Sequence, residues 1–163
     1  MKRSIVLRIV CLFVLLFVGC NIEQADTVTL HQPPELKVTV GDRNVNPTCI
    51  SPQWTVWDED GNVIDGYITE SGHTLQSYEL GKPELVIEET EAFLNFAVEP
   101  DWISVTCWKE NAIHQEYPVS EKCILKDHTL ELHPGSYIYE IKAKWERALY
   151  EGTANYSFYI KTQ

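Results

Sequence analysis

Five cysteines and five histidines are the side chains of this sequence best suited to chemistry. Cys20 differs from the other cysteines because it follows a small residue, Gly19, after an apolar run from Ile9 to Val18. A thiol at such a position can carry a diacylglyceryl group once a peptidase has cut the chain just before it. We therefore expect Cys20 to be the lipidated first residue of the mature chain.

The segment before Cys20 has the organisation of a removable export signal, with a basic start at Lys2, Arg3 and Arg8. Its apolar run would form about 15 Å of helix, which is too short to cross a hydrocarbon core about 30 Å thick. The sequence Phe17-Val18-Gly19-Cys20 resembles the lipobox of bacterial lipoproteins, with Phe17 where that motif usually has Leu. We expect a signal peptide at residues 1–19 and an extracytoplasmic chain held on the bacterial cell membrane by lipid. The alternative is an ordinary signal peptide with an incidental Cys20.

Three further cysteines remain in the mature chain, Cys49, Cys107 and Cys123. Outside the cytoplasm, thiols can persist as disulfides. An odd number allows one intramolecular bridge and leaves one thiol over. We predict that Cys107 pairs with Cys123, because the stretch between them contains a turn-like Glu110-Asn111-Ala112; a fully reduced set is the alternative.

The histidines and carboxylates form no recognisable metal or catalytic motif. No two histidines have the His-x-His or His-x3-His spacing. Asp58 to Asn62 begins like a calcium loop, but Thr69 stands at the twelfth position, where such a loop needs Glu. Gly-x-Ser-x-Gly, Ser-x-x-Lys and Cys-x-x-Cys are also absent from the sequence. We expect no bound metal, no cofactor and no catalysis.

Aromatic side chains are the remaining candidates for recognition, since five Trp and eight Tyr exceed the needs of a small core. Trp102 and Trp108 lie on one face of a predicted strand, and Trp57 and Tyr67 flank an acidic turn. Exposed aromatic rings stack on sugars or anchor protein interfaces. We predict a binding surface that contains Trp102, Trp108, Trp57 and Tyr67. The alternative is that these rings belong to the core or cover sheet edges.

Short strands would have to position these residues. The clearest is Tyr137 to Trp145, where every second residue is apolar, and Thr153 to Lys161 is its predicted partner in an antiparallel hairpin. Many short strands separated by Gly, Pro, Asn and Asp predict a single all-β antiparallel sandwich at residues 35–163. Residues 20–34 are polar and end in Pro33-Pro34, which predicts a lipidated tether.

Leu132 to Tyr137 places a tyrosine just after a Pro-Gly turn, at the start of a strong strand. This arrangement resembles the tyrosine corner of immunoglobulin-like and fibronectin-type sandwiches, whose hydroxyl bonds to upstream backbone. With the sequence PDWISVTCW and the closing hairpin, residues 35–163 resemble small membrane lipoproteins of Bacillus-type bacteria that carry an immunoglobulin-like domain. The resemblance implies an immunoglobulin-like β-sandwich and transfers no catalytic residue.

Charge limits the classes of partner. Removal of the first 19 residues takes away three basic residues and no acidic one, so the net charge changes from −11 to −14. Such a charge disfavours nucleic acid and anionic lipid head groups. We expect a domain that is attached to the membrane through lipid on Cys20, binds an envelope protein or cell-wall ligand, and is not an enzyme. The alternatives are a structural envelope lipoprotein without a discrete ligand, or a small cell-surface hydrolase or inhibitor.

Overall fold

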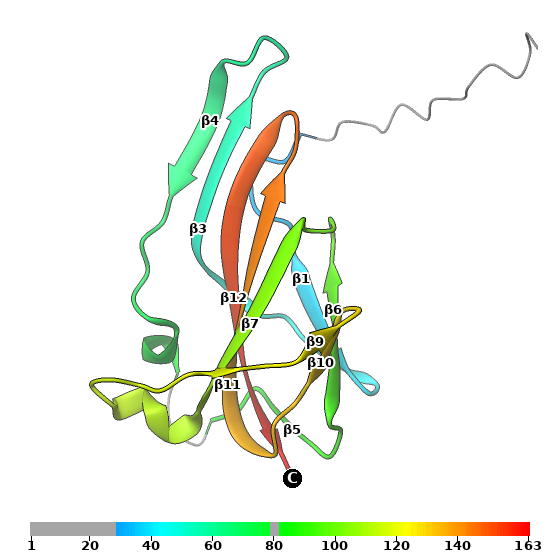
Figure 1. Ribbon diagram of the computed structural model, residues 1–163, viewed down its shortest axis with the longest axis vertical. Coiled ribbons are helices and arrows are strands. Elements are labelled where there is room, and N and C mark those ends of the chain that lie inside the picture. Colours follow the sequence, from blue (N-terminus) through cyan, green and yellow to red (C-terminus); the bar gives the residue numbers. More distant parts are fainter. Residues whose placement is uncertain (1–28, 79–81) are drawn as a thin grey trace, which may run out of the picture.

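The computed structural model describes residues 29–78 and 82–163, which form two sheets packed face to face (Figure 1). Neighbouring strands are antiparallel except where one short strand joins the larger sheet in parallel. The predicted all-β antiparallel sandwich is therefore confirmed. The predicted signal peptide, Cys20 and the tether up to residue 28 lie outside the described residues. Among the described residues, no helix has the length and apolar character needed to cross a membrane.

The smaller sheet has the strand order β2-β1-β6-β10-β9. Its strands are β1 (Leu36–Val40), β2 (Arg43–Val45), β6 (Glu91–Phe96), β9 (Leu125–Lys126) and β10 (Thr129–Glu131). The larger sheet has the order β4-β3-β12-β11-β7-β8, and β5 pairs in parallel with the end of β12. Its strands are β3 (Thr48–Trp57), β4 (Val63–Ile68), β5 (Leu85–Ile87), β7 (Trp102–Lys109), β8 (Glu121–Lys122), β11 (Gly135–Glu146) and β12 (Tyr150–Thr162).

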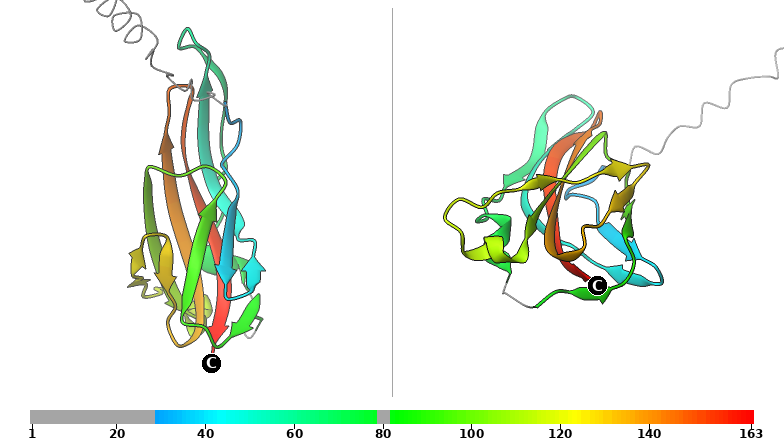
Figure 2. Two further views of the ribbon diagram at one scale, coloured as in Figure 1. Left: turned by 90° about the vertical axis from the view of Figure 1, so that its right-hand side faces the viewer. Right: turned by 60° about the horizontal axis from the view of Figure 1, so that its bottom comes forward.

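The hairpin of β11 and β12 is the centre of the larger sheet. Its register runs without interruption from Gly135 opposite Thr162 to Glu146 opposite Glu151, so the predicted hairpin is confirmed. Alternate residues of each strand face the core, as the period of two requires. The hairpins β3–β4 and β11–β12 both extend beyond the smaller sheet (Figure 2).

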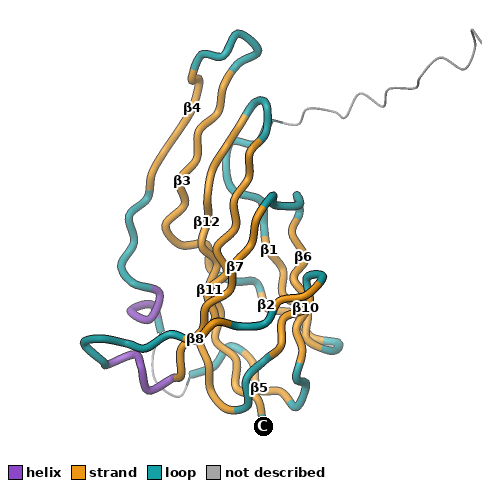
Figure 3. The backbone as a smooth tube through the Cα atoms, in the orientation of Figure 1, coloured by secondary structure: helices purple, strands orange, loops and turns teal. Residues whose placement is uncertain are grey.

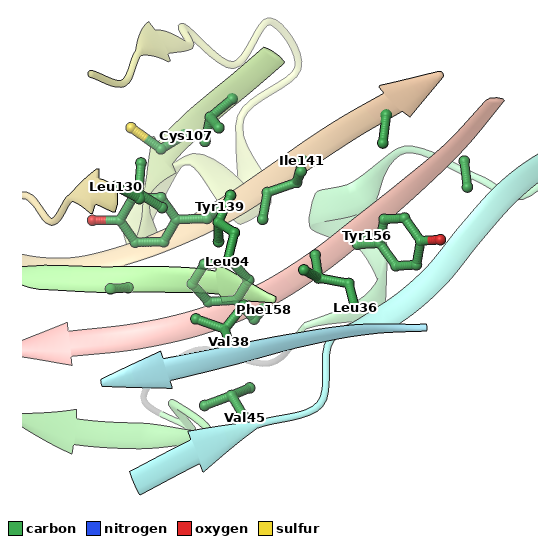
Figure 4. Packing of buried hydrophobic residues seen from close by; sticks show 14 of the residues in the cluster. Leu36, Val38, Val45, Leu94, Cys107, Leu130, Tyr139, Ile141, Tyr156 and Phe158 are labelled. Atoms are coloured by element: carbon green, nitrogen blue, oxygen red, sulfur yellow. The ribbon is translucent and has the colours of Figure 1, made fainter. Parts of the chain in front are cut away.

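The main core lies between the two sheets. Val38 and Leu94 from the smaller sheet are buried against Tyr139, Ile141 and Phe158 from the larger one (Figure 4). The rings of Tyr139 and Phe158 stack with their centroids 5.2 Å apart. Burial of these apolar groups is the main force that holds the sheets together.

A second, smaller core lies on the outer face of the larger sheet. There Trp108, Ile138 and Tyr159 are covered by Leu75 and Ala112, which come from two short 3-10 helices, η1 (Thr74–Ser77) and η2 (Glu110–His114). We call η1 and η2 the helical cap (Figure 3). The segment that carries η1 is fastened to the sheet by hydrogen bonds from Tyr78 Oη to Ser157 Oγ at 2.9 Å and from Thr74 to the Glu140 carboxylate.

Residues 30–34, at the end of the predicted tether, are bound to the domain. The indole N–H of Trp54 donates to the Leu30 carbonyl at 2.7 Å. The His31 ring nitrogen lies 2.9 Å from the Asp65 carboxylate, and the Tyr156 hydroxyl donates to the Pro34 carbonyl. The folded unit therefore begins before Glu35, the predicted start of the domain.

Candidate functional site

One row of side chains crosses the larger sheet through five neighbouring strands. The pairing places Ile68 of β4 opposite Gln53 of β3, and Gln53 opposite Thr153 of β12. Thr153 lies opposite Lys144 of β11, which in turn lies opposite Trp102 of β7. Directly opposed residues of antiparallel strands share a face, so all five side chains lie on one surface. We call these five residues the cross-sheet row.

The cross-sheet row faces outward, because the residues beside it in the sequence face the core. Trp54, Ala143 and Ala154 are buried between the sheets and are the neighbours of Gln53, Lys144 and Thr153. With neighbouring strands about 4.8 Å apart, the row is about 19 Å long. The helical cap covers Trp108 and Ile138 further along β7 and β11, whereas Trp102 at the start of β7 remains exposed.

The two ends of the cross-sheet row are apolar and its middle is polar. Ile68 and Trp102 are 69% and 50% exposed, whereas Gln53, Thr153 and Lys144 offer hydrogen-bonding groups between them. A shallow groove of about 640 Å³ runs along the part of the row from Ile68 to Lys144, and its other lining residues include Val63, Tyr67 and Glu151. The arrangement can hold an extended ligand through apolar contacts at both ends and hydrogen bonds between them.

Lys144 carries the positive charge of the cross-sheet row. Its ammonium group contacts the Glu146 carboxylate, and the hydrogen bond to that carboxylate raises the pKa of Lys144. Lys144 therefore stays protonated at neutral pH, with Glu146 as its counter-ion. The row can donate charged hydrogen bonds without presenting a strong net positive charge to a ligand.

The four aromatic residues predicted to form a binding surface do not share one. Trp102 is exposed in the cross-sheet row, whereas Trp108 is only 6% exposed and contacts His73 edge to face beneath the cap. Trp57 is half-buried at the end of β3. Half-buried Tyr67 lines both the row's groove and a larger groove of about 700 Å³ beside residues 32–37. Trp108 is therefore not part of an exposed surface, because η1 and η2 cover its side of the sheet.

The other members of the cross-sheet row were missed by the sequence analysis. Gln53, Thr153 and Ile68 belong to no motif, and only the strand register brings them beside Trp102. The predicted β11–β12 hairpin contained one usable signal, because a short connection places Lys144 close to Thr153. The turn Asp58 to Asn62, whose Asp-Gly sequence is typical of a hairpin, likewise indicated that β3 and β4 pair, whereas the pairing of β3 with β12 had no local signal.

A second cluster consists of Cys107, Cys123 and His133. One ligand atom from each residue lies within 4.8 Å of the corresponding atoms of the other two. All three cysteines in the described part of the chain are free thiols, and Cys49 lies on β3, away from this cluster. The structure thus brings the predicted disulfide partners Cys107 and Cys123 together as thiols, and the bridge itself stays a prediction.

The three residues meet at one side of the sandwich, where the chain passes between the sheets. Cys123 lies between β8 of the larger sheet and β9 of the smaller one. His133 lies in the connection that returns from β10 to β11. Cys107 is fully buried on the core-facing side of β7, beside Leu130 and Tyr139 (Figure 4). The cluster therefore joins one rigid strand to two crossing segments.

His133 is held in place by neighbouring tyrosines. Its backbone N–H donates to the Tyr139 hydroxyl at 2.8 Å, and its ring stacks on Tyr137 at 4.9 Å. The hydroxyl that binds the upstream backbone therefore belongs to Tyr139 and not to Tyr137, the residue predicted from the sequence. Tyr139 faces the core and reaches the upstream backbone from inside, whereas the Tyr137 hydroxyl interacts with Lys109.

The two thiols of the cluster share a hydrogen bond. This bond lowers the pKa of Cys107, which is the acceptor, and it raises the pKa of Cys123 together with burial. The Glu121 carboxylate lies 3.7 Å from His133 Nδ1. The cluster thus combines two sulfur ligands and an imidazole with a carboxylate at its edge. The sequence has no motif that joins these residues, because His133 lies ten positions after Cys123 and Cys107 lies sixteen positions before it.

No protein family model, no curated protein and no solved structure matches this chain.

Proposed function

We propose that this chain is a lipid-anchored extracytoplasmic binding domain without catalytic activity, and that the cross-sheet row is its ligand-binding surface. The observation that carries the proposal is the register that lines up Ile68, three hydrogen-bonding side chains and Trp102 on one open face. The lipobox-like Phe17-Val18-Gly19-Cys20 supports the anchor and the location.

An immunoglobulin-like type of sandwich is part of the proposal. It is supported by the hydroxyl of Tyr139, which binds the backbone of His133 at the start of a central strand. The position matches the role of a corner tyrosine, although the residue differs from the predicted one. The long β11–β12 hairpin gives the binding face a rigid base, because its twelve paired positions fix Lys144 and Thr153.

The ligand class that fits the cross-sheet row best is a cell-wall glycan. Trp102 offers a flat ring on which a sugar can stack, and Gln53, Thr153 and Lys144 can hydrogen-bond to hydroxyl groups. A row of about 19 Å suits a chain of several linked sugars better than a single small molecule. The predicted net charge of −14 for the mature chain favours a ligand that is neutral or positively charged over an anionic one.

The proposal is tested by sedimentation of the full-length chain, held in detergent, with insoluble cell-wall material. We expect Trp102→Ala to weaken binding by about 30-fold, the effect of losing a hot-spot residue worth about 2 kcal/mol. Phe93→Ala is the matched control, since Phe93 is 45% exposed on β6 of the smaller sheet. Unchanged binding by Trp102→Ala, or equal losses in both variants, would contradict the proposal.

A second candidate function is the binding of a protein strand at the edge of β4. Among the described residues, β4 is the last strand of its sheet, and Val63 and Ile64 are 63% and 55% exposed. An apolar edge strand can pair with a strand of another protein. An Ile64→Lys variant that loses an envelope protein but still sediments with cell-wall glycan would favour this candidate.

A further inference from the structure

We propose that Cys107, Cys123 and His133 form a zinc-binding site between the two sheets. The site lies beside the core, away from the cross-sheet row, and does not depend on the function proposed for that row. No sequence motif predicts this site, because its ligands come from one strand and from two separate segments that cross between the sheets.

The distances suit a tetrahedral ion. With Zn–S bonds of about 2.3 Å and Zn–N bonds of about 2.0 Å, ligand atoms of such a site lie about 3.5–3.8 Å apart. The ligand atoms of Cys107, Cys123 and His133 already lie within 4.8 Å of one another. Side-chain rotations that move the ligand atoms by about an ångström would bring them to these distances, with the strands left in place.

The ligands are also oriented before any metal arrives. Cys107 is fixed in the core on β7, and His133 is held by its bond to Tyr139 and by the ring of Tyr137. Metal-bound imidazoles commonly have a carboxylate beside them that fixes the ring and raises its basicity. Glu121, at 3.7 Å from His133 Nδ1, occupies a position suited to this role.

Charge and ligand type favour zinc over other common cations. Two thiolates neutralise a divalent ion, so the completed site has no net charge to bury beside the core. Sulfur and imidazole ligands disfavour Mg²⁺ and Ca²⁺, which prefer oxygen. Cys107, Cys123 and His133 leave the fourth position for a water molecule.

A disulfide between Cys107 and Cys123 is the competing outcome, and the register argues against it. The Cys123 N–H donates to the Val105 carbonyl at 3.4 Å, which places Cys123 opposite Val105 and diagonal to Cys107. Diagonal residues across a ladder have Cα atoms about 7–8 Å apart, whereas disulfides usually need about 4.4–6.8 Å. The sulfur atoms themselves share a hydrogen bond and lie within 4.8 Å of each other, so a metal ion can bind both without movement of the backbone.

The test uses the full-length chain in detergent, reduced, freed of metal with a chelator and then titrated with Co²⁺ and Zn²⁺. We expect one equivalent of metal per chain and a thiolate-to-cobalt charge-transfer band that zinc abolishes. Cys123→Ser and His133→Asn should lose the band, whereas the matched control Cys49→Ser should keep it. Glu121→Gln should weaken zinc affinity by about 10- to 100-fold.

The wild-type chain decides the matter even if a variant fails to fold. Absence of the charge-transfer band in the reduced wild type would overturn the proposal. So would a Cys107–Cys123 disulfide that forms in air in the presence of one equivalent of zinc, as shown by thiol counting and peptide mass spectrometry. Loss of the band in Cys49→Ser, with circular dichroism unchanged, would also contradict the assignment.

Discussion

Replacement of Tyr139 by phenylalanine should destabilise the fold measurably, although it removes a single oxygen atom. Tyr139 is completely buried, and its hydroxyl accepts the backbone N–H of His133 at 2.8 Å. In the variant this N–H has no acceptor in a partly buried position. A buried donor left without a partner costs about 1–3 kcal/mol, more than the ordinary net value of one hydrogen bond.

The matched comparison is Tyr137→Phe, because the sequence predicts that the hydroxyl of Tyr137 binds the upstream backbone. Its hydroxyl interacts with the flexible side chain of Lys109, which is exposed. Loss of that interaction should cost about 0.5 kcal/mol or less. The two variants remove the same atom from residues two positions apart, so the difference between them isolates the corner hydrogen bond.

The assay is equilibrium urea unfolding followed by tryptophan fluorescence. For a slope of about 2 kcal/mol/M, the expected loss in Tyr139→Phe lowers the urea midpoint by about 0.5–1.5 M. The Tyr137→Phe midpoint should lie within about 0.25 M of the wild type. Equal midpoints for the two variants, or a lower one for Tyr137→Phe, would refute the stabilising role of the Tyr139 hydroxyl.

Three further outcomes follow from burial and hydrogen bonding. Trp102→Ala should change the free energy of unfolding by no more than about 0.5 kcal/mol, whereas Trp108→Ala beneath the cap should lower it by about 3–5 kcal/mol in the same urea assay. Burial raises the pKa of Tyr78 to about 12, so the contribution of Tyr78 to stability should be constant below about pH 10, where unfolded tyrosine ionises, and should fall as the pH rises towards 12. Urea midpoints measured from pH 8 to 12 check this, and a flat profile would contradict it. Trp54→Phe should raise the rate of backbone hydrogen exchange at residues 30–34 by about 2- to 10-fold, because the hydrogen bond to the Leu30 carbonyl is lost. Mass spectrometry measures this rate, and an unchanged rate would show that the bond does not hold the segment.

Much of the larger sheet could be predicted from the sequence, because its strands carry a clear alternation of core and surface residues. The face of β11 from Tyr137 to Trp145 and the opposing face of β12 are buried as expected. Trp102 and Trp108 also lie on one face of β7, and Val105 and Cys107 lie on its other, core-facing side, as predicted. Local periodicity is sufficient for these features because each depends on residues close together in the chain.

The remaining features depend on contacts between distant segments. Trp108 is buried because η1, more than 30 residues upstream, packs over it together with η2. The cross-sheet row depends on the register of β3 against β12, which is shifted by a bulge between Thr153 and Asn155. Cys107, Cys123 and His133 meet only because two connections cross between the sheets at the same place. A single sequence contains no local pattern for any of these.

The bound segment at residues 30–34 would limit how far the domain can move from the membrane under the lipid anchor proposed above. With Cys20 lipidated as proposed, the ten residues from 20 to 29 span at most about 36 Å, even when fully extended. Leu30 is bound to Trp54, the neighbour of Gln53 in the cross-sheet row, so the attachment point lies near the row, on the core-facing side of the same sheet. An anchored domain of this kind stays in a thin layer next to the bilayer. A cell-wall glycan would then reach the row only where the glycan chain comes close to the membrane surface.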